Sequence, residues 1–150
     1  MASVVTLPVS LDYEAGFEVL LRAGQFVRCH PSITAKHFRP QRRGLGRVSR
    51  DALLVKFGME MLPEHVLLEL AREGCRVGDI CELLTLGTQH PKEQRMGPIV
   101  ALGSVWVNRF GTAHVPYLYY ICQRRGIRPG LNDHWWSAQC RFLAFSQDPS

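Results

Sequence analysis

The sequence has no apolar run of the roughly 18 to 20 residues that a membrane-spanning helix needs. Proline, glycine or a charged residue interrupts every candidate stretch. The first ten residues also lack the basic start and the continuous apolar core of a secretory signal, and Pro8 falls where that core would run. These absences predict a cytoplasmic protein with no membrane partner.

The sequence also lacks a recognisable catalytic or metal-binding signature. Its five cysteines are an odd number at irregular spacings, which favours reduced thiols over a disulfide framework. No cysteine or histidine pair has zinc-finger spacing, and no nucleophile elbow, phosphate loop or dinucleotide fingerprint is present. We therefore predict no catalytic residue, no cofactor and no metal, and the sequence favours a binding protein over an enzyme. One alternative metal set comes from distant segments: His114, Cys122, His134 and Cys140.

The chain has the size and composition of an ordinary globular domain. It holds 150 residues, of which 46% are hydrophobic and 21% charged. No internal repeat and no linker rich in proline, glycine or serine divides it. We therefore predict one globular domain over residues 1–150.

Apolar periodicity predicts helices in the first two thirds of the chain. The spacing predicts an edge strand over 5–11, a helix over 13–23 that ends at Gly24, and a helix that begins at Pro63 and ends near Gly74. A second helix over 77–87 would complete a helical hairpin near 63–87. The apolar segment 52–57 fits either a strand or a helix, and we favour the helix.

Strand-forming residues dominate after Pro98. The segments 99–107, 114–122 and 135–145 predict three strands, with turns over 108–111 and 126–132. The predicted fold is α+β, in which N-terminal helices, including the hairpin near 63–87, pack on a C-terminal antiparallel β-meander over about 99–145.

The clearest functional signal is a basic loop over 36–50 that contains no acidic residue. The net charge is +5, and 15 of the 18 basic residues are arginine, which suits bidentate contacts with phosphate or carboxylate. We predict a polyanion-binding surface formed by Arg39, Arg42, Arg43, Arg47 and Arg50, with a second patch at Arg124, Arg125 and Arg128. The alternative is a solvated loop whose arginines pair with acids elsewhere in the chain.

Aromatic residues of the predicted sheet suggest a second kind of contact. Trp106, Tyr117, Tyr119 and Trp135 would form a platform on which unpaired bases stack, with roughly 1–3 kcal/mol per base. The alternative is that these side chains fill the core between the sheet and the helices.

Together these signals predict a non-enzymatic binding module for nucleic acid or another polyanion, acting through the arginine-rich loop. The first alternative is a protein-interaction or assembly subunit, whose partner is an acidic protein or a second copy of the chain. A cysteine- or metal-dependent enzyme is the remaining alternative.

Overall fold

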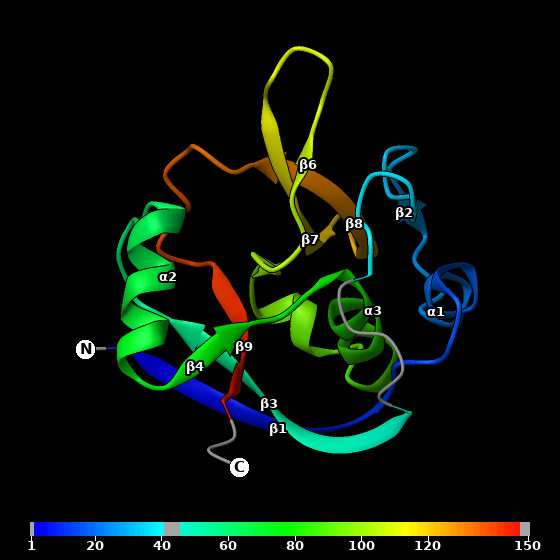
Figure 1. Cartoon of the computed structure of the whole chain (residues 1–150), viewed down its shortest axis with the longest axis horizontal. Coiled ribbons are helices and arrows are strands. Elements are labelled where there is room, and N and C mark those ends of the chain that lie inside the picture. The colour runs from blue at the N-terminus through cyan, green and yellow to red at the C-terminus, as the bar shows by residue number, and fades with distance from the viewer. Residues whose placement is uncertain (1, 41–45, 148–150) are drawn as a thin grey trace.

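The computed structural model describes residues 2–40 and 46–147, and over these residues the chain forms a nine-stranded mixed sheet with three short α-helices (Figure 1). The strand order is β1-β3-β9-β5-β7-β8-β2, with β4 paired to β9 and β6 paired to β7. Along the chain the elements are β1 (Ser3–Asp12), α1 (Phe17–Ala23), β2 (Arg28–Cys29), β3 (Arg47–Lys56), α2 (Pro63–Arg72), β4 (Cys75–Val77), α3 (Ile80–Gln89), the 3₁₀ helix η1 (Glu93–Met96), β5 (Ile99–Val100), β6 (Trp106–Val107), β7 (Ala113–Ile121), β8 (Arg124–Leu131) and β9 (Arg141–Ser146).

The predicted arrangement of N-terminal helices on a C-terminal meander is wrong, because the N-terminal part of the chain supplies strands to the same sheet. β1 and β3 pair antiparallel from Ser3 opposite Lys56 to Asp12 opposite Arg47. The apolar segment 52–57, for which a helix was favoured, lies mostly within β3. Its side chains alternate between two apolar clusters, with Leu54 in one and Val55 in the other. A strand that is covered on both faces has no amphipathic period to identify it.

The predicted helical hairpin near 63–87 is also wrong. α2 begins at Pro63 as expected, and Gly74, with φ +72, follows its C-terminal end. The next residues form β4, which pairs antiparallel with β9, so a strand separates α2 from α3. α3 begins after Asp79, whose carboxylate accepts a hydrogen bond from the Glu82 amide in a capping box. The pairing of β4 depends on a partner about 70 residues away in the sequence, which local periodicity does not reveal.

The C-terminal segment is not a simple meander. β7 and β8 form the antiparallel hairpin, and its turn lies at Cys122 and Gln123, both with positive φ, so the predicted turn over 126–132 is mostly strand. β9 does not follow β8 in the sheet. It lies between β3 and β5, antiparallel to β3 and parallel to β5.

The sheet separates two apolar clusters. On β9, Leu143 and Phe145 face the cluster that includes α1 and α3, whereas Phe142 and Ala144 face the cluster that includes α2. A central strand covered on both faces is expected to carry such a continuous apolar run. The hairpin of β6 and β7 projects from this body (Figure 1), and none of the described helices is long and apolar enough to span a bilayer.

The first prediction concerns the central strand. Leu143 is fully buried, and its side chain occupies the space that a Cβ at Gly78 would take, at 2.6 Å. Leu143→Ala should lower the free energy of unfolding by about 2–5 kcal/mol, because it leaves a cavity where the sheet packs on the start of α3. Urea unfolding followed by circular dichroism measures this change.

The matched control is Leu67→Ala on α2, where the side chain is 45% exposed. Its free energy of unfolding should change by less than about 1 kcal/mol. Equal losses for the two variants would contradict the placement of β9 at the centre of the sheet.

Candidate ligand-binding site

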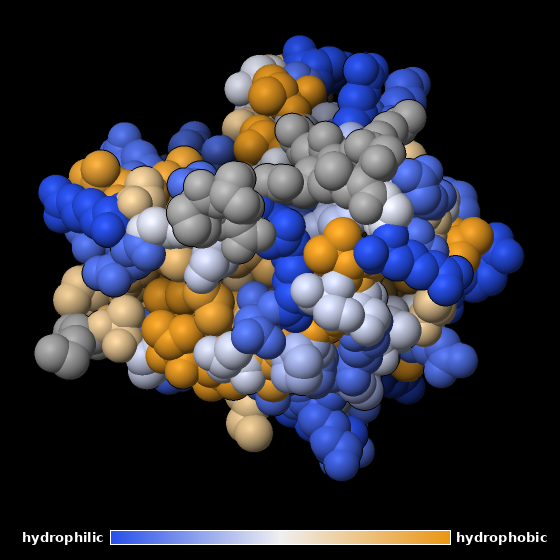
Figure 2. Space-filling view, turned by 60° about the horizontal axis from the view of Figure 1, so that its bottom comes forward, coloured by the Kyte–Doolittle hydropathy of each residue, from blue (hydrophilic) through white to orange (hydrophobic). Residues whose placement is uncertain are grey.

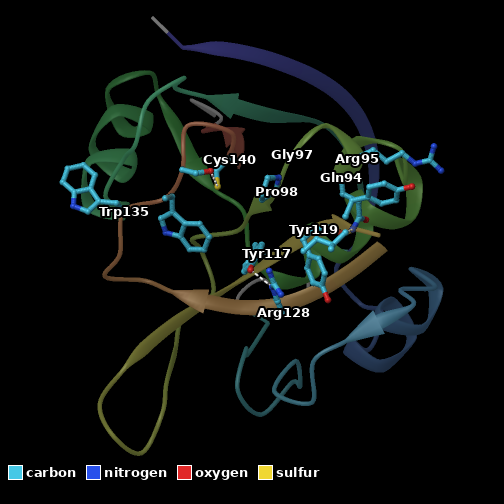
Figure 3. Close-up of a pocket in the computed structure, with 13 residues that line it drawn as sticks. Gln94, Arg95, Gly97, Pro98, Tyr117, Tyr119, Arg128, Trp135 and Cys140 are labelled. Atoms are coloured by element: carbon cyan, nitrogen blue, oxygen red, sulfur yellow. Dashed lines mark hydrogen bonds between the residues drawn. The ribbon is translucent and has the colours of Figure 1, made fainter. Parts of the chain in front are cut away.

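A cavity of about 300 Å³ lies where the β7–β8 hairpin meets η1 and the segment that leads into β9 (Figure 3). Five aromatic residues and two arginines are among the residues that line it, and none of the described lining residues is acidic. The lining residues are Gln94, Arg95, Gly97, Pro98, Tyr117, Tyr119, Tyr120, Ile121, Arg128, Trp135, Trp136, Ser137 and Cys140. Such a wall suits a ligand that combines a flat ring with negative charge.

The strand register brings Tyr117 and Arg128 together. Tyr117 on β7 lies opposite Arg128 on β8, so their side chains are on the same face of the sheet. Tyr119, two residues further along β7, lies on this face as well.

Two glycines of β8 make room for the aromatic rings on this face. Gly126 and Gly130 alternate with Arg128 along the strand. A Cβ at Gly126 would lie 2.2 Å from the ring of Tyr119, and one at Gly130 would lie 2.5 Å from the ring of Trp136. Side chains at these two positions would therefore displace the rings that form the cavity wall.

The Arg128 guanidinium is held in place by the tyrosines. Its Nε donates a hydrogen bond of 2.5 Å to the Tyr117 hydroxyl, and its Cζ lies 4.3 Å from the centre of the Tyr119 ring. Among the described residues, no acceptor bonds to its two terminal nitrogens. The side chain is half-buried, so these two donors remain for a ligand.

Arg125 has a different environment, although it was predicted in the same patch. Its guanidinium donates to the carbonyl oxygens of Gly24 and Gly87 and to the side chain of Gln94. Burial, together with the nearby charge of Arg95, lowers its pKa. Arg125 therefore joins the C-terminal ends of α1 and α3 to the hairpin.

The predicted basic loop is only partly described. Arg42 and Arg43 lie outside the described residues. Arg39 and Arg47 are exposed, and the Nε of Arg47 lies 3.6 Å from a carboxylate oxygen of Asp12. Arg50 is half-buried on β3 opposite Val9. The residues of the predicted second patch do not form one surface either, because Arg124 is exposed and is not among the residues that line the cavity.

The four residues that were predicted to form one stacking platform do not all lie together. Tyr117, Tyr119 and Trp135 line the cavity, whereas Trp106 packs between His37 and His114, with ring centroids 4.1 and 5.0 Å away. Trp135 is 57% exposed and lies at one end of the residues labelled in Figure 3.

Sequence reasoning missed Arg95, Tyr120 and Trp136, all of which line the cavity. The doublet Trp135–Trp136 and the alternation of glycine with Arg128 were the available signals. No sequence signal indicated Arg95, because this residue lies on η1 and not on the hairpin. Its guanidinium lies 5.4 Å from the ring centre of Tyr120.

A second cavity, of about 340 Å³, lies beside the start of α1. Asp12 and Glu14 contribute to its wall, and no lysine or arginine is among the described residues that line it. Arg47 lies beside Asp12 and partly offsets its charge, whereas no described residue that lines the cavity beside Arg128 is acidic. The cavity beside Arg128 is therefore the better anion site of the two.

A buried ion pair lies between α3 and β4. Glu82, 1% exposed, accepts two hydrogen bonds from Arg76, at 3.0 and 2.7 Å, and one of 2.7 Å from the Tyr13 hydroxyl. Burial alone would raise the pKa of Glu82, but the bonds from Arg76 and Tyr13 outweigh it and hold that pKa below its ordinary value. Burial and the bond to Glu82 raise the pKa of Tyr13. This closed network fixes the start of α3 against the sheet.

The alternative metal set does not converge. His114 and Cys122 lie at opposite ends of β7. Over the described part of the chain, no group of three potential metal-ligating histidine, cysteine or acidic side chains is close enough to hold an ion.

Comparison with protein-family models, with curated proteins and with solved structures finds no match to this chain. Function is therefore inferred from the geometry and charge of the cavity.

The second prediction concerns the pH dependence of stability. Because the folded-state pKa of Glu82 lies below its ordinary value of 4.5, its ionised form stabilises the fold above that pH. This contribution is lost as the pH falls through the folded-state pKa. Glu82→Gln should cost about 3–5 kcal/mol at neutral pH, because it leaves Arg76 unpaired, and should reduce the loss of stability on acidification.

Urea unfolding of both proteins between about pH 7 and pH 3 tests this expectation. The matched control is Glu69→Gln, which removes an exposed partner of Arg72 and should leave the pH dependence close to that of the unaltered chain. An unchanged pH dependence in Glu82→Gln would contradict the role of the buried pair.

Proposed function

We propose that the protein is a non-enzymatic binding module for nucleic acid and that it prefers unpaired strands. The observation that carries this proposal is the cavity wall, in which Tyr117 and Tyr119 orient the guanidinium of Arg128, tryptophans lie beside them, and no described lining residue is acidic. Aromatic rings stack on any base, and an arginine fork binds phosphate through two parallel hydrogen bonds.

The charge of the whole chain supports an anionic partner. Its net charge is +5, and Arg39, Arg47 and Arg124 are exposed. Exposed arginines contact phosphates without reading sequence, and the affinity they contribute falls with added salt. We infer that they attract the strand while the cavity holds one of its bases.

The shape of the site favours unpaired over paired bases. The cavity is lined on one side by the β7–β8 hairpin and on the other by η1, Gly97, Pro98 and the segment 135–140. A base in a duplex would have to leave its stack to enter, at a cost of a few kcal/mol. An unpaired base enters without that cost.

The third prediction is a preference for single strands that depends on Arg128. Labelled single- and double-stranded oligonucleotides of equal length should bind with affinities that fall steeply between about 50 and 200 mM salt, with the single strand bound more tightly. Arg128→Gln should weaken single-strand binding by about tenfold or more and reduce the preference, because it removes a charged bidentate contact. Fluorescence anisotropy measures both quantities.

The matched control is Arg124→Gln, which makes the same change of charge on the same strand but outside the cavity lining. It should leave the single-strand preference unchanged.

The combined replacement of Arg42, Arg43 and Arg47 by alanine tests the basic loop, and an unchanged salt slope would exclude that loop as a contact surface. Absence of binding at low salt would refute the nucleic-acid proposal.

A second candidate function is an assembly subunit that pairs with another copy of the chain. Exposed apolar side chains occur on the α2 side of the edge strand: Val4, whose partner Val55 packs with α2, and Met59, Leu67 and Leu68. The start of β1 pairs with the end of β3, and α2 begins seven residues later, at Pro63. Figure 2, in which β1 is turned toward the viewer, shows apolar side chains gathered on one side of this face. Contact through such a surface would resist salt, because screening weakens charge contacts and not apolar burial.

The fourth prediction distinguishes the two candidates. If the chain is an assembly subunit, sedimentation should detect a dimer that persists in about 1 M salt, and Leu68→Glu should dissociate it. Val19→Glu on α1, where the side chain is 61% exposed, is the matched control and should leave the dimer intact. A monomer at every concentration would exclude assembly through this surface.

A further inference from the structure

The size of the cavity limits what it can hold. A volume of about 300 Å³ is at the lower end of small-molecule sites in proteins. It accommodates one base with its sugar and phosphate, but not a stack of bases. The site therefore differs from an open groove that follows a strand over many nucleotides.

The charged and aromatic residues are distributed along the cavity. Figure 3 shows Trp135 and Arg95 at opposite ends of the labelled residues, with Tyr117, Tyr119 and Arg128 between them. A ligand with a ring at one end and a negative charge at the other matches this order. The ring would lie at the tryptophan end, and the charge would lie at Arg128. The Arg95 guanidinium points away from Arg128 and lies on the ring of Tyr120.

The guanidinium of Arg128 is already oriented for contact with an anion before any ligand binds. Because its Nε is bonded to the Tyr117 hydroxyl and its face lies on Tyr119, its orientation is fixed while the two terminal nitrogens remain available. A fixed donor pair loses little conformational freedom on binding. Two oxygens of one phosphate match the spacing of such a fork.

The amide of Gln94 is not available for reading a base. Its nitrogen donates to the carbonyl oxygens of Tyr119 and Gly126, and its oxygen accepts from Arg125. The Ser137 hydroxyl is likewise engaged with Cys140 and the amide of Gln139. With this amide and this hydroxyl engaged, we expect stacking and charge to dominate the contact and discrimination among bases to be weak.

We propose that the cavity binds a single nucleotide, with its base against Trp135 and Trp136 and its phosphate on Arg128. The inference rests on the proposed function and specifies the ligand of the same site. A free mononucleotide and one unpaired nucleotide of a strand share this chemistry.

The experiment is calorimetric titration of the full chain with four probes at low salt: AMP, UMP, adenosine and inorganic phosphate. AMP and UMP should bind with affinities within about tenfold of each other, because the site stacks rings without reading their edges. Adenosine and phosphate should each bind at least about tenfold more weakly than AMP, because each lacks one of the two contacts.

Two variants test which residue contacts the phosphate and which contacts the base. Arg128→Gln should remove the difference between AMP and adenosine, and Arg124→Gln is its matched control. Trp135→Ala should weaken AMP binding by several-fold and leave the binding of phosphate unchanged. Phe110→Ala is the control for Trp135→Ala, since Phe110 is 77% exposed on the β6–β7 hairpin outside the cavity. Trp135 is largely exposed, so Trp135→Ala tests the inference even if an Arg128 variant fails to fold.

Competition distinguishes the two sources of the nucleotide. Displacement of a labelled single strand by AMP supports a shared site, and tighter binding of the strand than of AMP identifies the strand as the preferred ligand. If the strand binds but AMP does not, or if adenosine binds as tightly as AMP, the single-nucleotide inference is overturned while the proposed function stands. If neither the strand nor AMP binds, both are overturned.

Discussion

The architecture depends on the burial of β9 at the centre of the sheet. This strand pairs with β3 on one side and with β4 and β5 on the other, and its side chains alternate between the two apolar clusters. Arg141, at the start of β9, is 5% exposed. Its guanidinium donates hydrogen bonds to the carboxylate of Glu93, at 2.8 Å, and to the backbone carbonyl oxygen of Glu93. That contact fixes η1, which supplies Arg95 to the cavity. The core and the candidate site are therefore connected through one strand.

Neighbouring arginines of β8 have different roles because a strand presents alternate residues to opposite faces. Arg125 faces α1 and α3, where helix-terminal carbonyl oxygens accept hydrogen bonds from its guanidinium. Arg128 lies on the other face, between Gly126 and Gly130, and retains two donors. Arg125, which joins the helices to the hairpin, is therefore a different side chain from Arg128, which we propose contacts the ligand. A charge count along the sequence does not distinguish them.

Local patterns predicted the elements whose own residues decide their conformation. The alternation of apolar residues over 5–11 identified an edge strand, and Pro63 with Gly74 identified α2, because these signals act within a few residues. Segment 52–57 and residues 75–77 were misassigned because their conformation depends on β9, a distant partner. For the candidate site, Tyr117 and Tyr119 were recognisable from their alternation along a strand. Their association with Trp136 and Arg95 was not, since these residues come from segments that only the folded chain brings together.

The sequence by itself determined the sign of the charge, the preference for arginine and the aromatic, strand-forming character of the last third of the chain. These properties belong to individual residues and their near neighbours. Only the tertiary structure decided which arginine is engaged and which has free donors, and which tryptophan lines a cavity and which packs between histidines. The reason is that pairing register and the packing of distant segments set the direction and burial of each side chain, and neither is encoded in spacing along the chain.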